Sequence, residues 1–175
     1  MIKQTYEKGS YVVYGTDGIC VIDDVTEMSF MAGMEKSRYY VLKPEHSSDS
    51  KVYVPAANEK LMSKLRPLLT RQEIDMLLTG MRDKELEWET DRRLRTEKFH
   101  EILTNGVTES LLLMIRSIYL KKNELENMGR KLAASDMNTL KTAEKLVEEE
   151  FACVLGIEKK DVGAYIRSMI QAGRE

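Results

Sequence analysis

Cysteine, histidine and proline are scarce in this chain, and each scarcity excludes a class of protein. The 175 residues include two cysteines, two histidines and three prolines. Cys20 and Cys153 lie far apart without CxxC spacing, so we expect two buried, reduced thiols and no disulfide framework. A zinc site needs three or four convergent ligands, which His46 and His100 do not supply with two remote cysteines. We therefore expect no bound metal and no cofactor.

The chain also lacks a strong charge of one sign and a long apolar run. The formal net charge is −2, with 7 Lys and Arg against 9 Asp and Glu in residues 1–60 and 20 against 20 in residues 61–175. A stand-alone nucleic-acid-binding domain usually carries a basic excess, so any DNA contact must be local and weak by itself. No run of 18 apolar residues and no apolar leader is present, which predicts a cytoplasmic protein without a membrane span.

Sequence motifs of the common enzyme classes are absent as well. The chain contains no G-x-x-x-x-G-K-[ST], no G-x-G-x-x-G, no G-x-S-x-G and no kinase motif set. Its many carboxylates fall on predicted helix surfaces, where carboxylates are far more often solvated than catalytic. We therefore expect a protein that is not an enzyme.

The first third of the chain is typical of a small β-domain. Runs rich in Val, Ile and Tyr are separated by Gly, Asp and Ser, which predicts short antiparallel strands. Pro55 ends the last run, because proline cannot donate to a strand ladder. The predicted strands cover residues 10–15, 18–28, 37–43 and 51–55, and they form a small, bent antiparallel sheet in a domain of residues 1–60.

The remaining two thirds are predicted to be helical, so the fold class is α+β. Residues 56–69 are expected to be a connector, since Pro67 cannot lie in a helix interior. Thr70 and Glu73 form a capping-box pattern at the start of the next helix. The helices of the all-helical domain, residues 61–175, are predicted at about 71–79, at about 88–104, from a Thr108 cap, from Ser135-Asp136 to Gly156, and from Asp161.

The single tryptophan, Trp88, is followed by a cluster of arginines. If a helix spans residues 88–104, Trp88, Arg92 and Arg95 project from one face, and Arg93 belongs to the same basic run in the sequence. In one interpretation the arginines hold phosphates while the indole stacks on a base, which is worth roughly 1–3 kcal/mol per base. In the other, Trp88 anchors the core beside a solvated helix face. The residues alone leave both interpretations open.

The order of the strand motifs resembles one known family. The chain has Gly9-x-x-Val-Val-Tyr14, Gly18, Val21-Ile-Asp-Asp-Val25, Tyr40-Val-Leu-Lys43 and Val52-x-Val-Pro55 with Asn58, followed by Trp88, Phe99-x-x-Ile-Leu103 and Asn105-Gly106. These elements are similar to the CarD family of bacterial transcription regulators. The N-terminal module of that family is shared with the RNA polymerase-interacting domain of the transcription-repair coupling factor.

The resemblance implies a fold, two partners and a set of site residues. It implies that a Tudor-like N-terminal module docks on the β subunit of RNA polymerase, and that the helical domain contacts promoter DNA without sequence specificity at the upstream edge of the transcription bubble. Carried onto this chain, the wedge into the minor groove is Trp88, with backbone contacts from Arg92, Arg93 and Arg95. The candidates for the polymerase-facing surface are Met28, Tyr40, Lys51 and Tyr53.

The chain departs from the family pattern in two places. Family members often carry basic residues on the second and last strands of the docking module, where this chain has Met28 and Tyr53. A more apolar polymerase-facing surface is therefore expected. The spacing from Trp88 to the arginines is also longer than in the members compared.

Three functions follow from these observations. The first is a monomeric transcription regulator that binds the polymerase β subunit and stabilises the promoter open complex with Trp88. The second is a protein-protein adaptor that does not bind DNA and holds Trp88 in its core. The third is a sequence-specific repressor, which would need a base-reading helix that the sequence does not reveal.

Overall fold

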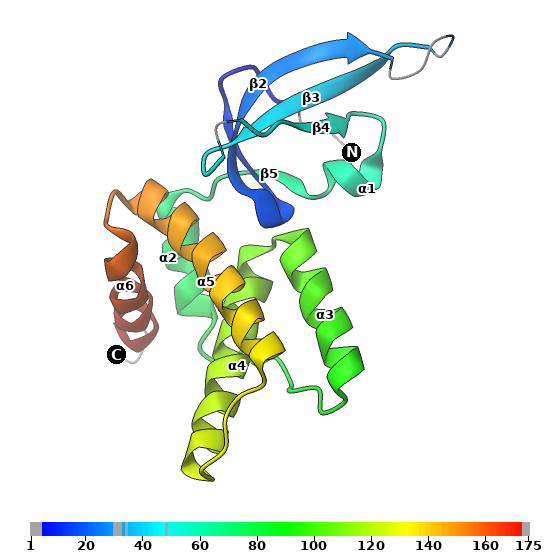
Figure 1. Ribbon diagram of the computed structural model, residues 1–175. Helices are drawn as coiled ribbons and strands as arrows, with labels where there is room; N and C mark the ends of the chain where they lie inside the picture. Colours follow the sequence, from blue (N-terminus) through cyan, green and yellow to red (C-terminus); the bar gives the residue numbers. More distant parts are fainter. Residues whose placement is uncertain (1–4, 30–32, 34, 48, 173–175) are drawn as a thin grey trace. The chain divides into compact units, whose positions relative to one another are not determined.

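The computed structural model describes residues 5–29, 33, 35–47 and 49–172. The chain divides into two compact units, Met1–Leu68 and Leu69–Glu175. Figure 1 shows a sheet in the first unit, the sheet unit, and helices in the second, the helical unit. The predicted α+β class is therefore confirmed.

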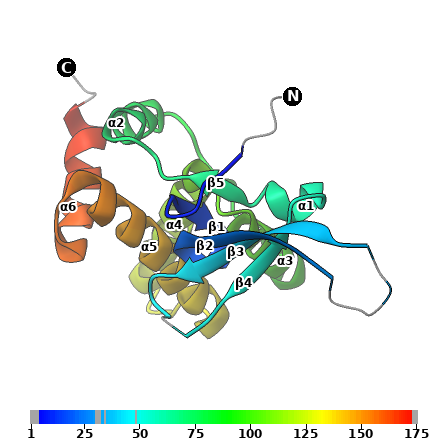
Figure 2. The ribbon, with the colours of Figure 1, turned by 90° about the horizontal axis from the view of Figure 1, so that it is seen from above.

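The sheet unit contains a five-stranded antiparallel sheet. Along the sheet the strand order is β4-β3-β2-β1-β5, so β4 and β5 are its two edge strands. The two long central strands, β2 and β3, lie side by side in Figure 2. The strands are β1 (Tyr11–Tyr14), β2 (Gly18–Met28), β3 (Ser37–Pro44), β4 (Val52–Pro55) and β5 (Leu65–Pro67).

Local backbone features set the register of these strands. The short 3-10 turn η1 (Gly15–Asp17) joins β1 to β2, and Gly18 follows it with a φ of 67°, which a residue with a side chain rarely adopts. Between Ile22 and Asp24 the pairing of β2 with β3 shifts by one residue, so Asp23 is the extra residue of a β-bulge.

One face of the sheet carries the core of this unit. Val12, Ile22, Leu42 and Val54 are fully buried there, each contributing about 1.5–3 kcal/mol by its removal from water. Tyr6 closes this core, since its hydroxyl donates a 3.0 Å hydrogen bond to the carbonyl of Leu65.

Residues 56–69 are not the simple connector that the sequence predicted. Asn58 caps the one-turn helix α1 (Glu59–Met62), because its side-chain oxygen accepts a hydrogen bond from the backbone N–H of Leu61. Strand β5 then pairs with β1, and the sheet unit consequently extends to Leu68 rather than to residue 60. Pro67 is compatible with this strand because it lies at an edge of the sheet.

The helical unit contains five described helices. Antiparallel α4 and α5 lie side by side in Figure 1, and α6 packs on α2 and α5. The helices are α2 (Arg71–Gly80), α3 (Arg92–Asn105), α4 (Thr108–Asn127), α5 (Ala134–Leu155) and α6 (Lys159–Ala172).

Several helix ends agree with the sequence. Thr70 and Glu73 form the expected capping box of α2. Gly106 and Gly156 end α3 and α5 in the left-handed conformation, with φ values of 64° and 67°. Their carbonyl partners, Ile102 and Ala152, accept from the two glycine N–H groups.

Other helix ends differ from the prediction. Helix α3 begins at Arg92 rather than at residue 88, because Asp91 is its N-cap and accepts hydrogen bonds from two backbone N–H groups. Thr108 does not cap α4, since its buried hydroxyl donates to Glu150 instead. Helices α5 and α6 begin one and two residues before the predicted starts at Ser135 and Asp161.

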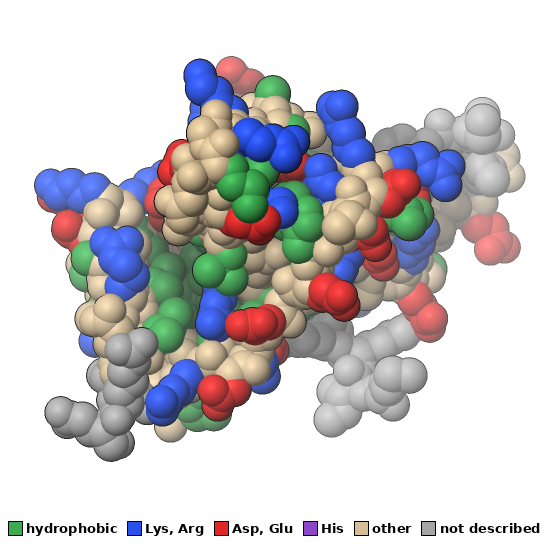
Figure 3. All heavy atoms as spheres, turned by 90° about the horizontal axis from the view of Figure 1, so that it is seen from below, with side chains coloured by type: hydrophobic (Ala, Val, Ile, Leu, Met, Phe, Trp, Pro, Cys, Tyr) green, Lys and Arg blue, Asp and Glu red, His purple; other side chains and the backbone are tan. Residues whose placement is uncertain are grey.

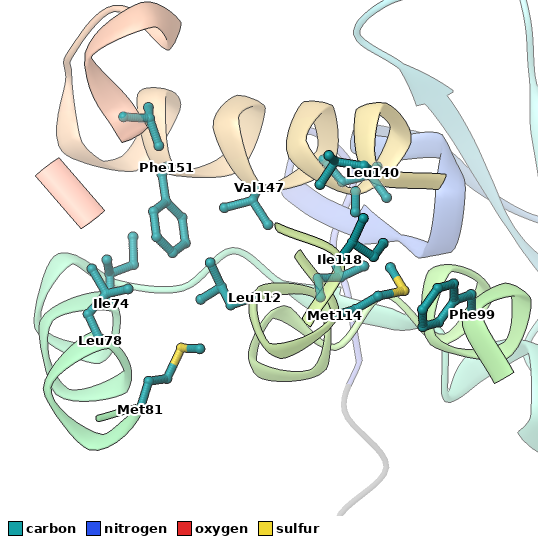
Figure 4. Close-up of a cluster of buried hydrophobic side chains, with 14 of the residues drawn as sticks. Ile74, Leu78, Met81, Phe99, Leu112, Met114, Ile118, Leu140, Val147 and Phe151 are labelled. Atoms are coloured by element: carbon teal, nitrogen blue, oxygen red, sulfur yellow. The ribbon is translucent and has the colours of Figure 1, made fainter. Parts of the chain in front are cut away.

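The core of the helical unit draws on every one of its helices. Figure 4 shows Ile74 and Leu78 of α2, Met114 and Ile118 of α4, and Phe151 of α5 among the buried side chains. Each of these five side chains is fully buried. This single cluster holds the helices in the arrangement that positions the candidate site.

The two cysteines lie in different surroundings. Cys20 is buried on β2, as predicted, whereas Cys153 on α5 is exposed, so the prediction of two buried thiols was wrong for Cys153. Within the described residues, no group of three or more Cys, His, Asp or Glu side chains has the arrangement of a metal site. No helix among those residues is long and apolar enough to span a membrane.

Candidate nucleic-acid and polymerase interfaces

Trp88 lies in the segment between α2 and α3, residues 81–91, which we term the Trp88 loop. Side chains from the following helices hold the carbonyls of this loop. Arg116 of α4 donates through Nη1 to the carbonyls of Met81 and Lys84 at 3.3 and 3.2 Å. Lys98 of α3 donates to the carbonyl of Glu87 at 3.4 Å. The loop is therefore fastened immediately before Trp88 as well as at its start.

The half-buried indole of Trp88 packs against two side chains of α3. The Phe99 ring lies edge-on to it, with 6.0 Å between the ring centroids and 69° between the ring planes. The guanidinium carbon of Arg95 lies over the indole, 4.6 Å from the ring centroid, which is a cation–π geometry. Helical spacing brings Arg95 and Phe99 onto one face of α3, so both reach the same indole.

Arg95 is buried and forms an ion pair within the helical unit. Only 7% of the residue is exposed, and its Nη2 and Nε donate to the two carboxylate oxygens of Asp136 at 3.0 and 3.2 Å. Its Nη1 donates to the carbonyls of Glu89 and Thr90 at 2.9 and 3.4 Å. Asp136 is also buried and lies in the first turn of α5, where the helix dipole favours a negative charge.

Arg92 and Arg93, in contrast, are exposed at the start of α3. Arg93 forms a 3.8 Å ion pair with Glu97 one turn later, and 82% of its side chain is exposed. The first turn of α3 holds no acidic residue, although acidic residues are the ones that a helix N-terminus favours. Arg92 and Arg93 therefore do not stabilise α3 through its dipole, because they place positive charges at its N-terminus.

Charge is segregated along the chain around Trp88. The Trp88 loop contains two basic and five acidic residues, whereas residues 92–98 contain four basic residues and one acidic residue. On the face seen in Figure 3, Lys and Arg side chains are interspersed with Asp and Glu around a hollow lined by hydrophobic side chains. A basic surface near Trp88 is thus restricted to the start of α3.

On the sheet unit, the four candidates for the polymerase-facing surface have different environments. Tyr53 is 42% exposed on the edge strand β4, and Met28 is half-buried at the end of β2. Lys51 precedes β4 and pairs with the bulge residue Asp23 at 2.7 Å, which lowers the pKa of that carboxyl. Tyr40 is only 3% exposed and belongs to the core of the sheet.

Tyr40 packs between two other residues of the sheet unit. The Tyr6 ring lies edge-on to Tyr40 with centroids 5.8 Å apart, and the guanidinium of Arg38 lies 5.9 Å from the Tyr40 centroid. Tyr40 therefore contributes to the packing of β3, and little of its ring remains exposed for a partner to contact.

Two residues important to the Trp88 site were not recognised in the sequence. Asp136 is 41 residues from Arg95 in the chain, and no local spacing relates them. Arg116 lies within the apolar run of α4, where a charge signals only that one helix face is partly exposed. A buried charged residue can be recognised in a sequence when it interrupts an apolar pattern. The residue that pairs with it cannot be recognised in this way.

One comparison with known proteins identifies the first unit. Residues 6–66 match the family model described as the CarD-like/TRCF RID domain. The match covers the sheet unit and less than half of the chain, and we use the term RID domain for the matched residues. The match confirms the resemblance drawn from the strand motifs, and a search of curated proteins found no match for the chain.

The RID domain assignment agrees with the observed limits of the sheet unit. The matched residues reach Arg66 in β5, so the match includes most of the strand that was missed in the sequence. The helical unit lies outside the match. The assignment suggests an RNA polymerase-interacting, transcription-related protein, with the polymerase β subunit as the partner of the RID domain.

Proposed function

We propose that the protein is a non-catalytic transcription regulator that docks on the polymerase β subunit and stabilises the promoter open complex. In this proposal the RID domain tethers the helical unit to polymerase, which raises its local concentration at the promoter. Trp88 then favours unpaired DNA at the upstream bubble edge over closed duplex, so the equilibrium shifts by differential binding. The protein acts as a monomer in the bacterial cytoplasm, where polymerase works.

The fixed orientation of the Trp88 indole is the observation that supports the proposed contact with DNA. Phe99 and Arg95 hold the ring in one orientation at the surface of the helical unit. An indole that is already ordered loses little side-chain entropy when it stacks on a base. Stacking contributes roughly 1–3 kcal/mol per base, whereas unstacking an intact base step costs a few kcal/mol. Trp88 would therefore act where the DNA is already opened.

Arg92 and Arg93 are the phosphate contacts that we propose. Both are exposed and follow Trp88 closely, at the N-terminus of a helix, which itself attracts anions. Arg95 is left out of this set because its guanidinium is buried against Asp136. The five acidic residues of the Trp88 loop oppose phosphate, so the affinity of the helical unit for DNA without polymerase is expected to be low.

For polymerase docking we propose the accessible side of β4 and the end of β2. Tyr53 offers an exposed aromatic ring on the edge strand β4, with Lys51 before it, and Met28 ends β2, which is separated from β4 by β3. A large ring and a methionine fit a partly apolar interface. Tyr40 supports β3 from the core and makes no contact itself.

The test of the proposal is the lifetime of promoter open complexes formed by bacterial RNA polymerase. We expect Trp88→Ala to shorten the lifetime about 5- to 150-fold, the range that corresponds to one lost stacking contact. Binding of the same variant to the polymerase β subunit should be unchanged. An unchanged lifetime would rule out the wedge, and a loss of β-subunit binding would show that the variant acts through the RID domain.

A matched pair of variants tests the phosphate contacts. Arg92→Gln should weaken DNA binding and lower the slope of log affinity against log salt by about 1. Arg130→Gln removes another exposed arginine, from the turn after α4, and should leave that slope unchanged. Equal effects of both substitutions would indicate a general charge effect and no contact at the start of α3.

A protein-protein adaptor is the second candidate, and the packing of Trp88 favours it. The indole is half-buried against Phe99, and the loop that carries it is acidic. In an adaptor, Trp88 emission would be blue-shifted and poorly quenched by iodide, with no change on addition of a forked promoter duplex. Quenching of the Trp88 emission by that duplex, in the presence of polymerase, would favour the transcription regulator.

A further inference from the structure

Arg95 occupies the centre of the Trp88 site but is not placed to contact a ligand. Its guanidinium offers five N–H donors, and four hydrogen bonds to protein oxygens are formed by them. The residue is 7% exposed. A phosphate could reach it only if the pairing with Asp136 were broken, which would leave a carboxylate buried without its partner.

The same guanidinium joins three segments that are separate in sequence. It extends from α3, binds Asp136 in the first turn of α5, and donates to the carbonyls of Glu89 and Thr90 immediately after Trp88. Its guanidinium carbon also lies over the indole of Trp88, 4.6 Å from the ring centroid. Arg95 therefore links the indole to both α3 and α5, whereas Phe99 contacts the indole from α3 alone.

Arginine is the only residue that meets all of these geometric demands. Its planar fork binds a carboxylate through two parallel hydrogen bonds, and its plane stacks on an aromatic ring. A buried ion pair adds little net stability over a well-packed apolar pair. What the pair with Asp136 supplies at this place is a single orientation for the guanidinium, and hence for Trp88.

We propose that the Arg95–Asp136 ion pair is a positioning device that orients the Trp88 indole for its contact with opened DNA. Arg95 is accordingly a positioning residue and makes no phosphate contact. The functional half of this inference rests on the proposed wedge, whereas the orientation of Trp88 by the pair is a property of the protein alone.

The orientation is tested by fluorescence of Trp88, the only tryptophan, in the full-length protein. Arg95→Lys keeps the charge but loses the fork and the stacked plane, so acrylamide quenching should rise roughly twofold as a second ring face opens. Asp136→Asn keeps the shape of the side chain that binds Arg95 but removes its charge. Acrylamide quenching of Trp88 should rise in this variant as well. Arg130→Lys, at an exposed position in the turn after α4, is the control and should leave the emission and the quenching unchanged. Unchanged emission and quenching in both folded variants would overturn the proposal.

The lifetime of the promoter open complex separates positioning from phosphate contact. If Arg95 were a masked phosphate contact, Asp136→Asn would release it and lengthen the lifetime. If Arg95 positions Trp88, Asp136→Asn shortens the lifetime severalfold, and polymerase binding stays intact. A longer lifetime would therefore overturn the proposal. If Trp88→Ala itself kept the full lifetime, while the fluorescence responded as expected, the wedge would be refuted and the positioning of Trp88 by Arg95 and Asp136 would be supported.

Discussion

Removing the Asp136 carboxylate is predicted to cause a large loss of stability in the helical unit. Asp136→Ala leaves the guanidinium of Arg95, which is 7% exposed, without a counter-charge and without two of its hydrogen bonds. Breaking a buried pair on one side costs about 3–5 kcal/mol, because the remaining charge is still desolvated. For a unit of this size the loss corresponds to a fall in Tm of about 12–20 °C.

The assay is urea unfolding followed by the emission of Trp88. Because Trp88 is the only tryptophan and lies in the helical unit, the signal reports the unfolding of that unit. A domain of this kind has roughly 5–15 kcal/mol of stability, so the variant should still be folded in the absence of urea. Its transition should move to lower urea with an unchanged slope.

A double variant distinguishes the cost of an unpaired charge from the cost of lost packing. Arg95→Met combined with Asp136→Leu replaces the ion pair by apolar side chains, and it should recover more than half of the loss. The reasoning is refuted if Asp136→Ala costs less than about 1 kcal/mol, the value expected of an exposed ion pair. It is equally refuted if the double variant is less stable than Asp136→Ala alone.

Three further predictions concern the reactivity of the Cys20 thiol, the core of the helical unit and the pH dependence of the stability that Glu73 contributes. Burial raises the pKa of the Cys20 thiol to about 12, so alkylation of the native protein at pH 8 should modify the exposed Cys153 and leave Cys20 unmodified, as read by peptide mass spectrometry. Phe151→Ala should destabilise the helical unit by about 3–5 kcal/mol in urea unfolding, against a negligible effect of Met76→Ala at an exposed position. Hydrogen bonds from the backbone and hydroxyl of the N-cap threonine lower the pKa of Glu73, so the stability lost in Glu73→Gln should be greatest above about pH 4.3 and disappear as the pH falls through the lowered pKa.

Much of the fold was predictable because local sequence signals agreed with the final packing. The strands β2 and β3 follow from runs of Val, Ile and Tyr between Gly, Asp and Ser, and the start of α2 follows from the capping box of Thr70 and Glu73. Gly106 and Gly156 are likewise local signals, since glycine commonly follows the last residue of a helix, and both end a helix in the structure.

The elements that were missed depend on partners distant in the sequence. Strand β5 has three residues and ends in a proline, so only its pairing with β1 makes it a strand. The buried hydroxyl of Thr108 binds Glu150, 42 residues away, instead of capping its own helix. Local propensity cannot reveal such partners, because the contact exists only after the helices have packed.

At the candidate site, sequence reasoning singled out the indole of Trp88, but it misjudged the surroundings of the indole. A helix beginning at residue 88 would have placed the side chains of Trp88, Arg92 and Arg95 on one face. The structure instead places Trp88 in a loop before α3, while Arg95 reaches it from the helix. The Asp91 N-cap determines this difference, since it fixes where the helix begins.

The lifetime of promoter open complexes with Trp88→Ala tests the central claim most directly. Bacterial RNA polymerase would be saturated with the unmodified protein or with the variant, and the decay of the complexes would be followed after addition of a competitor. The account predicts faster decay with the variant, approaching that of polymerase alone, at an unchanged affinity for the β subunit. A lifetime equal to that with the unmodified protein would contradict the account.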